Sequence, residues 1–237
     1  MASSQGPGRS RPIVAIDGPA GAGKSTVARK LADALGFVLV DTGALYRAVA
    51  LAAKRTGVAW EDGTAVTALA DALVARQGLA FARDAERGVR VVLDGQDVSE
   101  AIRAPDMGMG ASTVSAHKGV RAALLDLQRQ AGREGGVVLE GRDIGTVVFP
   151  EAEVKFFLTA RPEVRARRRH EEQSARGATM TLEETLADVL RRDDQDTNRP
   201  VAPLRQAADA VLIDNSDITI DETVVRMAER VRARGTA

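Results

Sequence analysis

The chain has 237 residues, no net formal charge and no cysteine. Its 33 basic and 33 acidic residues argue against a nucleic-acid or membrane-surface binder, and the lack of cysteine excludes disulfides and thiolate metal sites. Hydrophobic residues make up 44% of the chain, enough for a core built mainly from Ala, Val and Leu. No apolar run approaches the roughly 20 residues of a membrane span. We therefore expect a cytoplasmic protein with no nucleic-acid or membrane partner. We also expect a monomer, because no apolar stripe is left over once the core is assigned.

Residues 1–12 lack the apolar centre of a signal peptide, so we expect a disordered tail before one domain over residues 13–237. The apolar run Ile13–Ile16 then leads into a glycine loop that opens a helix. The string GxxxxGKS between a strand and a helix is typical of a loop that binds nucleotide phosphates.

Each residue type of this loop suits that ligand. Backbone amides and the helix N-terminus hold phosphate oxygens, Lys24 reaches the β- and γ-phosphates, and the Ser25 hydroxyl binds Mg²⁺. The only histidines, His117 and His170, lack metal-ligand spacing. We therefore expect Mg²⁺ to be held by phosphates, Ser25 and water. The residues predicted to bind ATP are Gly18, Pro19, Ala20, Gly21, Ala22, Gly23, Lys24, Ser25 and Thr26.

A helix ending at Gly36 and a short strand over Phe37–Val40 come next. The strand delivers Asp41-Thr42-Gly43-Ala44-Leu45-Tyr46-Arg47 to the ligand side of a parallel sheet. Capping of the helix from Ala44 to about Thr56 is an alternative role for Asp41 and Thr42, but it explains neither Tyr46 nor Arg47.

Residues 57–120 change character and predict a small helical and β-hairpin insertion. It combines a helix through Val66 and Leu73 with a hairpin of two strands, Leu79–Ala82 and Val89–Leu93. A loop through Pro105, Gly108 and Gly110 is expected before a helix over Ser112–Leu127.

The apolar run Val137–Leu139 predicts a buried parallel strand that opens into Glu140-Gly141-Arg142-Asp143-Ile144-Gly145. Adjacent unlike charges at a strand end favour a ligand site, with a surface turn as the alternative. A strand over Val154–Leu158 and an arginine-rich helix from Pro162 follow.

The arginine-rich helix has two interpretations. Arg165, Arg168 and Arg169 share a face that could close over a triphosphate, whereas a solvated, ion-paired face is the simpler alternative. The next helix, from Leu182, carries Arg192, Asp196 and Arg199 at i, i+4 and i+7, with Arg199 expected to be extended before Pro200.

A strand over Ala210–Ile213 and a helix starting at Asp217 end the chain. The alternation of buried strands and helices predicts a three-layer α/β fold with a central parallel sheet.

Four motifs in this order closely resemble the bacterial cytidylate kinase family. They are IDGPAGAGKST, DTGALYR, EGRDIGTVVFP and RDDQDTNR, and the resemblance runs from about Ile13 to Arg232. It implies a P-loop kinase fold with an acceptor-nucleotide insertion over about residues 63–106 and a short mobile lid over about residues 161–180. It also implies transfer of the γ-phosphoryl group of Mg·ATP to CMP or dCMP.

The resemblance also implies roles for individual residues. Thr42, Arg47 and Arg142 would meet the acceptor α-phosphate, and Tyr46 would line the site. Arg192 and Asp196 would hold the ribose or the transferring phosphates. The base would be contacted by Ser112, Arg121, Asp143 and Arg199. The implied catalytic residues are Lys24, Arg142 and Arg192, and the implied substrate-binding residues are Asp41, Thr42, Tyr46, Arg47, Ser112, Arg121, Arg142, Asp143, Asp196 and Arg199.

General chemistry supports these roles. A planar guanidinium grips a phosphate with two hydrogen bonds, and a carboxylate such as Asp143 accepts from the amine of cytosine but repels the carbonyl of uracil. Two alternatives stay open, a kinase of another small acceptor and a nucleotide-driven nucleic-acid module. The neutral charge and the 3% aromatic content argue against the second.

Overall fold

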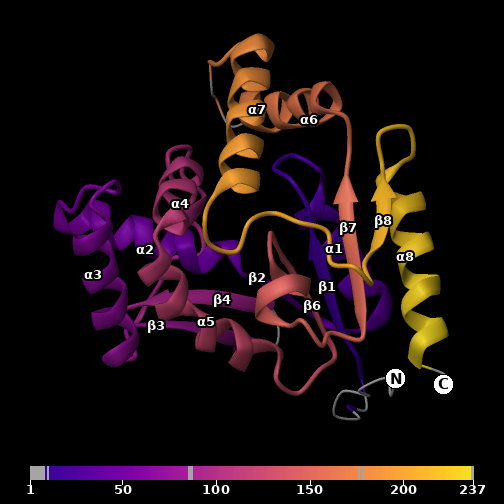
Figure 1. Ribbon diagram of the computed structural model, residues 1–237, viewed down its shortest axis with the longest axis horizontal. Helices are drawn as coiled ribbons and strands as arrows, with labels where there is room; N and C mark the ends of the chain where they lie inside the picture. Colours follow the sequence, from indigo (N-terminus) through magenta and orange to yellow (C-terminus); the bar gives the residue numbers. More distant parts are fainter. Residues whose placement is uncertain (1–8, 10, 85–87, 176, 178, 236–237) are drawn as a thin grey trace. The chain divides into compact units, whose positions relative to one another are not determined.

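The computed structural model describes residues 9, 11–84, 88–175, 177 and 179–235 (Figure 1). The chain forms two compact units, residues 1–40 with 132–237 and residues 41–131. We call them the sheet unit and the helical unit. The expected insertion over about residues 63–106 lies within the helical unit. Most of the expected tail, residues 1–8 and 10, lies outside the described residues, but Arg9 is described and pairs with Glu153 at 2.9 Å.

The sheet unit is built on a five-stranded sheet in the order β2-β6-β1-β7-β8. Strand β1 is fully buried and pairs in parallel with β6 and β7, and β7 pairs in parallel with β8. The strands are β1 (Ile13–Asp17), β2 (Val38–Asp41), β6 (Val137–Gly141), β7 (Val154–Thr159) and β8 (Val211–Asp214). The predicted α/β fold with a central parallel sheet is therefore confirmed.

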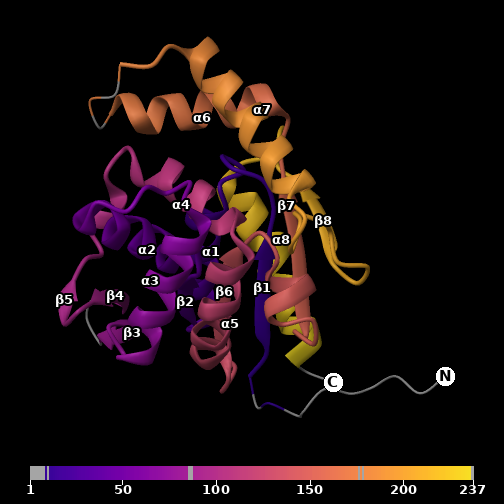
Figure 2. The same ribbon diagram turned by 60° about the vertical axis from the view of Figure 1, so that its left-hand side comes forward.

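Helices α1 (Lys24–Leu35) and α8 (Ile220–Gly235) pack against each other alongside this sheet (Figures 1 and 2). Their apolar faces join the strands in one buried cluster that includes Leu31 and Met227. Helix α8 begins three residues after the expected Asp217. The reason is a capping box, in which Thr219 Oγ1 accepts from the Glu222 amide and Glu222 accepts from the Thr219 amide.

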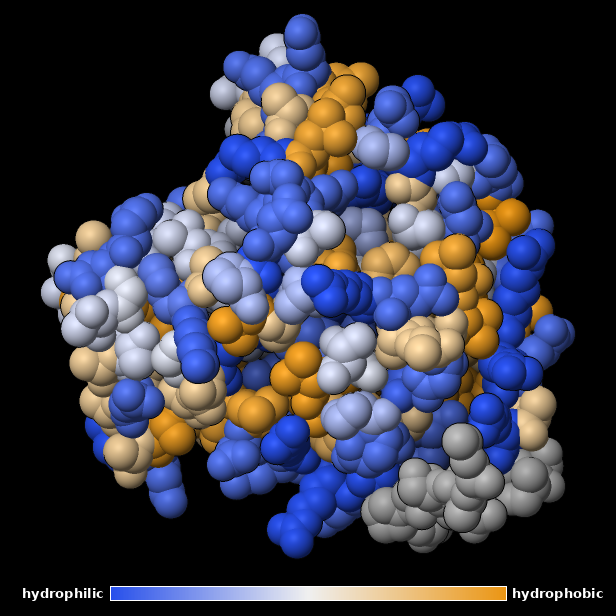
Figure 3. Space-filling view, in the orientation of Figure 1, coloured by the Kyte–Doolittle hydropathy of each residue, from blue (hydrophilic) through white to orange (hydrophobic). Residues whose placement is uncertain are grey.

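Helix α6 (Pro162–Ser174) covers most of the expected lid and packs against α7 (Leu182–Asn198), which begins just after it (Figures 1 and 2). Figure 3 shows mainly hydrophilic residues over this pair, with a hydrophobic group at its upper end. The exposed large hydrophobic residues of the region are Met180, Leu182 and Leu190. Arg199, the C-cap of α7, is extended as predicted from Pro200.

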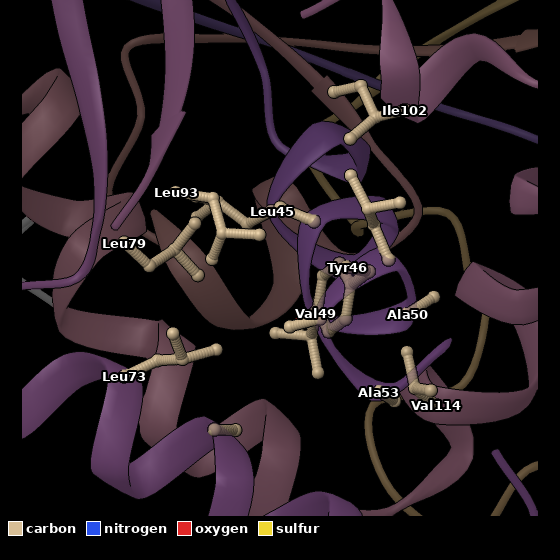
Figure 4. Packing of buried hydrophobic residues seen from close by; sticks show 14 of the residues in the cluster. Leu45, Tyr46, Val49, Ala50, Ala53, Leu73, Leu79, Leu93, Ile102 and Val114 are labelled. Atoms are coloured by element: carbon tan, nitrogen blue, oxygen red, sulfur yellow. The ribbon is translucent and has the colours of Figure 1, made fainter. Parts of the chain in front are cut away.

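The helical unit has its own core, centred on α2 (Gly43–Thr56). Figure 4 shows Leu45, Tyr46 and Val49 of this helix among Leu73, Leu79 and Leu93. The other elements of the unit are α3 (Gly63–Ala75), β3 (Leu79–Asp84), β4 (Gly88–Leu93), β5 (Gln96–Asp97), a 3₁₀ turn over Ala101–Arg103, α4 (Met107–Ala116) and α5 (Lys118–Gly132). Strands β3 and β4 form the expected antiparallel hairpin.

The expected loop through Gly108 and Gly110 is wrong, because both glycines lie inside α4. The expected helix over Ser112–Leu127 is divided at His117, whose backbone is extended and whose Nε2 lies 2.8 Å from the Trp60 carbonyl oxygen. Gly110 allows α4 to pack closely against Ala50 and Trp60. A Cβ at this position would come within 2.8 Å of both Ala50 Cβ and the Trp60 ring.

None of the helices in the described part of the chain is both long and apolar enough to cross a bilayer.

We expect Gly110→Ala to destabilise the protein, although alanine favours a helix by about 1 kcal/mol over glycine. The added methyl group overpacks the contact with Ala50 and Trp60, which costs about 1–3 kcal/mol. Urea unfolding followed by circular dichroism measures this cost. The control, Ser115→Ala on the same helix, should change stability by less than about 0.5 kcal/mol. A Gly110→Ala protein about 1 kcal/mol more stable than wild type, which is the helix preference of alanine alone, would contradict the close packing.

Candidate active site

The phosphate loop joins β1 to α1 and depends on glycine at three places. Gly18, Gly21 and Gly23 have φ of 151°, 76° and 83°, which side chains disfavour. At Gly18 a Cβ would also lie 2.0 Å from the Leu158 carbonyl oxygen of β7. Gly23 is the N-cap of α1 and has no side chain that could bond to the first amides of the helix. Those amides suit an anionic ligand.

Lys24 and Ser25 begin α1 and are both held by named partners. The Lys24 side chain is buried and donates to the Pro19 carbonyl at 2.6 Å. Burial, followed by repulsion from Arg142, lowers the pKa of Lys24 to about 7. The Ser25 hydroxyl donates to Glu140 Oε2 at 3.0 Å, which joins the loop to the end of β6.

This hydroxyl and carboxylate fit a magnesium ion. Mg²⁺ prefers oxygen ligands and usually combines one or two protein groups with substrate phosphates and water. Among the described residues, no three histidine, cysteine or acidic side chains are clustered so as to hold a metal by themselves. Ser25 and Glu140 are therefore the protein oxygens near the loop that are suited to this ion.

The structure brings Arg142 and Asp143 of EGRDIGTVVFP together with the C-terminal part of RDDQDTNR. Arg142 Nε donates to Asp196 Oδ2 at 2.7 Å, and Asp196 Oδ1 lies 3.5 Å from Arg199. Arg199 also lies 3.7 Å from Asp143 Oδ1 and donates to the Ala202 carbonyl at 2.7 Å. Asp143, Asp196 and Arg199 are all buried. Charged residues that directly follow β6 and that lie at the C-terminal end of α7 therefore form one ion-pair chain.

The pairing keeps these groups charged despite burial. Burial alone would raise the pKa of Asp196, but the Arg142 guanidinium outweighs it and holds the pKa below the ordinary value. Burial also opposes the charge of Arg142, yet Asp196 raises the pKa of this guanidinium further. Near neutral pH the ion-pair chain thus keeps alternating charges, which a bound anion or nucleobase could contact.

Asp17 was missed by the sequence reasoning, although a charged residue at the end of a buried strand is a usable signal. Its two carboxylate oxygens accept from the Ile144 and Gly145 amides at 2.8 and 2.7 Å. Desolvation by burial raises the pKa of Asp17 to about 6. These bonds hold the first turn of a π-helical segment, Ile144–Val148, directly after Arg142 and Asp143.

Arg192 lies on α7 with its Nε 3.0 Å from Asp188 Oδ2. Burial, followed by repulsion from Arg169, lowers the pKa of Arg192 to about 10. The side chain therefore stays charged near neutral pH. Asp188 also pairs with Arg169 at 3.3 Å and with Arg191 at 2.6 Å, so one carboxylate holds three guanidinium groups.

The three arginines of α6 do not form one face that is open to a triphosphate. Arg165 is 4% exposed and bonds to Ala20, Ala160 and Asp193, which also contradicts a solvated position. Arg168 donates to Asn215 at 2.9 Å, and Arg169 pairs with Asp188. Protein partners hold each guanidinium in this structure, and the closing of this face over a triphosphate stays a prediction.

The helical unit carries the remaining predicted residues. Arg47 pairs with Asp41 at 2.6 Å, and Arg121 lies over the Tyr46 ring at 5.4 Å. Ser112 is on α4. Thr42 is the N-cap of α2 but makes no side-chain capping bond, and Asp41 is engaged by Arg47, so helix capping does not explain these two residues. Lys24, Arg142, Asp143, Arg192, Asp196 and Arg199 belong instead to the sheet unit.

We expect nucleotide binding to take up about one proton at about pH 8, because free Lys24 is then mostly neutral and phosphate charge raises its pKa. The uptake should vanish below about pH 6, where Lys24 is already charged. Calorimetric titration in buffers of different ionisation enthalpy measures it. Lys24→Met is the control and should take up no proton. Equal uptake by both proteins would contradict a neutral Lys24.

Comparison with known proteins gives concordant results. The sequence profile described as cytidylate kinase matches residues 14–233. A cytidylate kinase of Geobacter sp. (strain M21) is 54% identical over 222 residues, 94% of this chain and 93% of that protein. The cytidylate kinase of Geobacter sulfurreducens is 52% identical over 230 residues, 97% of each chain. Among solved structures, an uncharacterized protein from Eubacterium ventriosum shares the fold, with a TM-score of 0.51 and 12% identity over 94% of this chain and 99% of that one. This chain therefore belongs to the cytidylate kinase family.

Proposed function

We propose that this kinase transfers the γ-phosphoryl group of Mg·ATP to CMP or dCMP, giving CDP or dCDP. The observation that carries the proposal is the buried ion-pair chain Arg142, Asp196, Arg199 and Asp143, in the same unit as the phosphate loop. The names of the related proteins support cytidylate as the acceptor.

The donor side rests on the phosphate loop. Residues 18–26 would bind the ATP phosphates, chiefly through the backbone amides that follow Pro19, and the Lys24 ammonium would balance charge on the β- and γ-phosphates. When bound, Mg²⁺ would neutralise phosphate charge and orient the triphosphate, held by Ser25 with Glu140 beside it. Lys24 is already seated at the loop through Pro19 and needs little reordering.

The acceptor side needs cations for a second polyanion. Arg142, Arg47 and Thr42 would hold the α-phosphate of CMP, with Asp41 orienting Arg47 and Tyr46 lining the site. Arg192 would stabilise charge on the equatorial oxygens of the moving phosphoryl group. The attacking phosphate oxygen is already ionised at neutral pH, so a general base is not required.

The base would be read by a carboxylate and its neighbours. Asp143 would accept from the exocyclic amine of cytosine, assisted by Arg199, Ser112 and Arg121. Uracil presents a carbonyl at the same place, and the two acceptors would repel each other. The pairing with Arg199 keeps Asp143 oriented within a buried setting.

Three finer features of the function belong to the same proposal. The region over about residues 161–180, which contains α6, would act as a lid that excludes water, because water would otherwise accept the phosphoryl group. The enzyme would work as a monomer in the cytoplasm. Its partners would be small nucleotides without nucleic acid, consistent with a net charge of zero.

We expect rapid ADP release from Mg·ATP only with CMP or dCMP as acceptor. A coupled assay with CMP, dCMP, UMP, AMP, shikimate or no acceptor tests this in parallel reactions. Shikimate and the empty reaction are the controls for another small-molecule kinase and for plain hydrolysis. Turnover without an acceptor, or only with an acceptor other than a cytidine nucleotide, would contradict the proposal.

We expect Asp143→Asn to lower kcat/KM for CMP by about 10- to 200-fold, as for the loss of a buried acceptor. ATP affinity should change little, because Asp143 has no role in the phosphate loop. Discrimination against UMP should narrow, since an amide can donate to the uracil carbonyl. Steady-state kinetics with each nucleotide and direct ATP titration measure both effects. Equal losses for CMP turnover and ATP binding would contradict a role in base recognition.

A further inference from the structure

Two carbonyl groups of the phosphate loop, those of Ala20 and Ala22, accept hydrogen bonds from side chains of the C-terminal half of the chain. Arg165 of α6 donates to the Ala20 carbonyl at 3.0 Å. Asn215, which follows β8 and is fully buried, donates to the Ala22 carbonyl at 3.0 Å. Arg168 in turn donates to the Asn215 side chain at 2.9 Å. Helix α6 is thus fastened to the loop at two points.

The backbone of α6 also lies directly against the loop. A Cβ added at Gly21 would come within 3.0 Å of the Arg165 carbonyl oxygen and 3.1 Å of Arg165 Cβ. The close approach leaves no room for a side chain between the loop and the helix. The first turns of α6, which is part of the proposed lid, therefore lie against the loop in this structure.

Arg165 reaches beyond the loop to α7. Its two terminal nitrogens donate to the two carboxylate oxygens of Asp193 at 3.0 and 2.6 Å, while its Nε donates to the Ala160 carbonyl. The side chain is only 4% exposed, so water does not screen this bidentate pair strongly. One guanidinium therefore joins the phosphate loop, the start of α6 and the C-terminal half of α7.

We propose that Arg165 and Asp193 are positioning residues. Their ion pair holds one turn of α7 at a fixed place relative to the phosphate loop, and this turn carries Arg192 and Asp196. Asp193 follows Arg192 directly and precedes Asp196 by three residues on the same helix. The inference rests on the proposed function, in which Arg192 acts on the phosphoryl group bound at the loop. A displacement of about 1 Å in such a group lowers the rate by about 100-fold in other enzymes.

The chain supplies a matched control for this role. Asp193 and Asp194 are adjacent aspartates, but consecutive residues of a helix face different directions. Asp194 is exposed and accepts from Asn198 at 2.7 Å, four residues later on the same helix. The same change at the two positions therefore removes the same charge, but only at Asp193 does it break the bond to Arg165.

The experiment compares Asp193→Asn with Asp194→Asn in the full-length enzyme with CMP and Mg·ATP. We expect Asp193→Asn to lower kcat by about 10- to 100-fold, with both KM values within about threefold of wild type. Asp194→Asn should leave kcat and KM unchanged. Thermal unfolding checks that both variants are folded. Equal kcat values for the two variants would overturn the proposal, as would loss of the fold in Asp193→Asn alone.

Two further measurements distinguish a positioning role from a general loss of protein stability. Arg165→Lys keeps the positive charge but loses the bidentate pair, so the double variant with Asp193→Asn should be no slower than the slower single variant. Independent, multiplying effects would overturn the proposal. Hydrogen exchange of the amides of residues 20–22 should rise in Asp193→Asn but not in Asp194→Asn, and unchanged exchange in both would also overturn it.

These measurements test the proposed function and the positioning role of Arg165 and Asp193 separately. Wild-type turnover of CMP tests the proposed function by itself. Amide exchange in the loop does not depend on the acceptor, so a rise confined to Asp193→Asn would support the connection between loop and α7 even if CMP were not the substrate.

Discussion

The phosphate loop can hold a ligand only if its backbone amides face that ligand. Its carbonyl groups must then accept hydrogen bonds from other parts of the protein. Lys24, Arg165 and Asn215 bind the carbonyls of Pro19, Ala20 and Ala22, respectively. All three side chains are buried, and an unpaired carbonyl in such a place would be costly. Residues from the first helix, the arginine-rich helix and the segment after the last strand are therefore needed for one phosphate loop.

Buried charge is the second constraint on the site. The cations that a phosphate would engage are kept charged by Asp196 and its neighbours, because an unpaired guanidinium or carboxylate is unstable in a buried setting. Lys24 is the exception, since burial lowers its pKa to about 7 and bound phosphate would restore its charge. Two polyanionic substrates can approach such a site without a large rearrangement of charge.

Neighbouring residues of similar type have different surroundings in the folded chain. Asp193 bonds to Arg165, whereas Asp194 is exposed. Among the arginines of α6, Arg165 is buried against the loop while Arg168 contacts Asn215 and Arg169 contacts Asp188. Helical spacing in the sequence grouped Arg165, Arg168 and Arg169 on one face, but it did not reveal which carbonyl or carboxylate each guanidinium would meet.

Local patterns by themselves determined the elements, the parallel sheet, the phosphate loop and the family, because strand runs, helix periods and four ordered motifs are properties of short segments. They failed at Gly108 and Gly110, which both lie inside α4, and at Gly110 packing against Trp60 and Ala50 overrides the usual preference of glycine for loops. Only the tertiary structure decided the roles of Asp17, Glu140 and Asp193. Their partners lie 127, 115 and 28 residues away, and such contacts exist only once the strands and helices have packed.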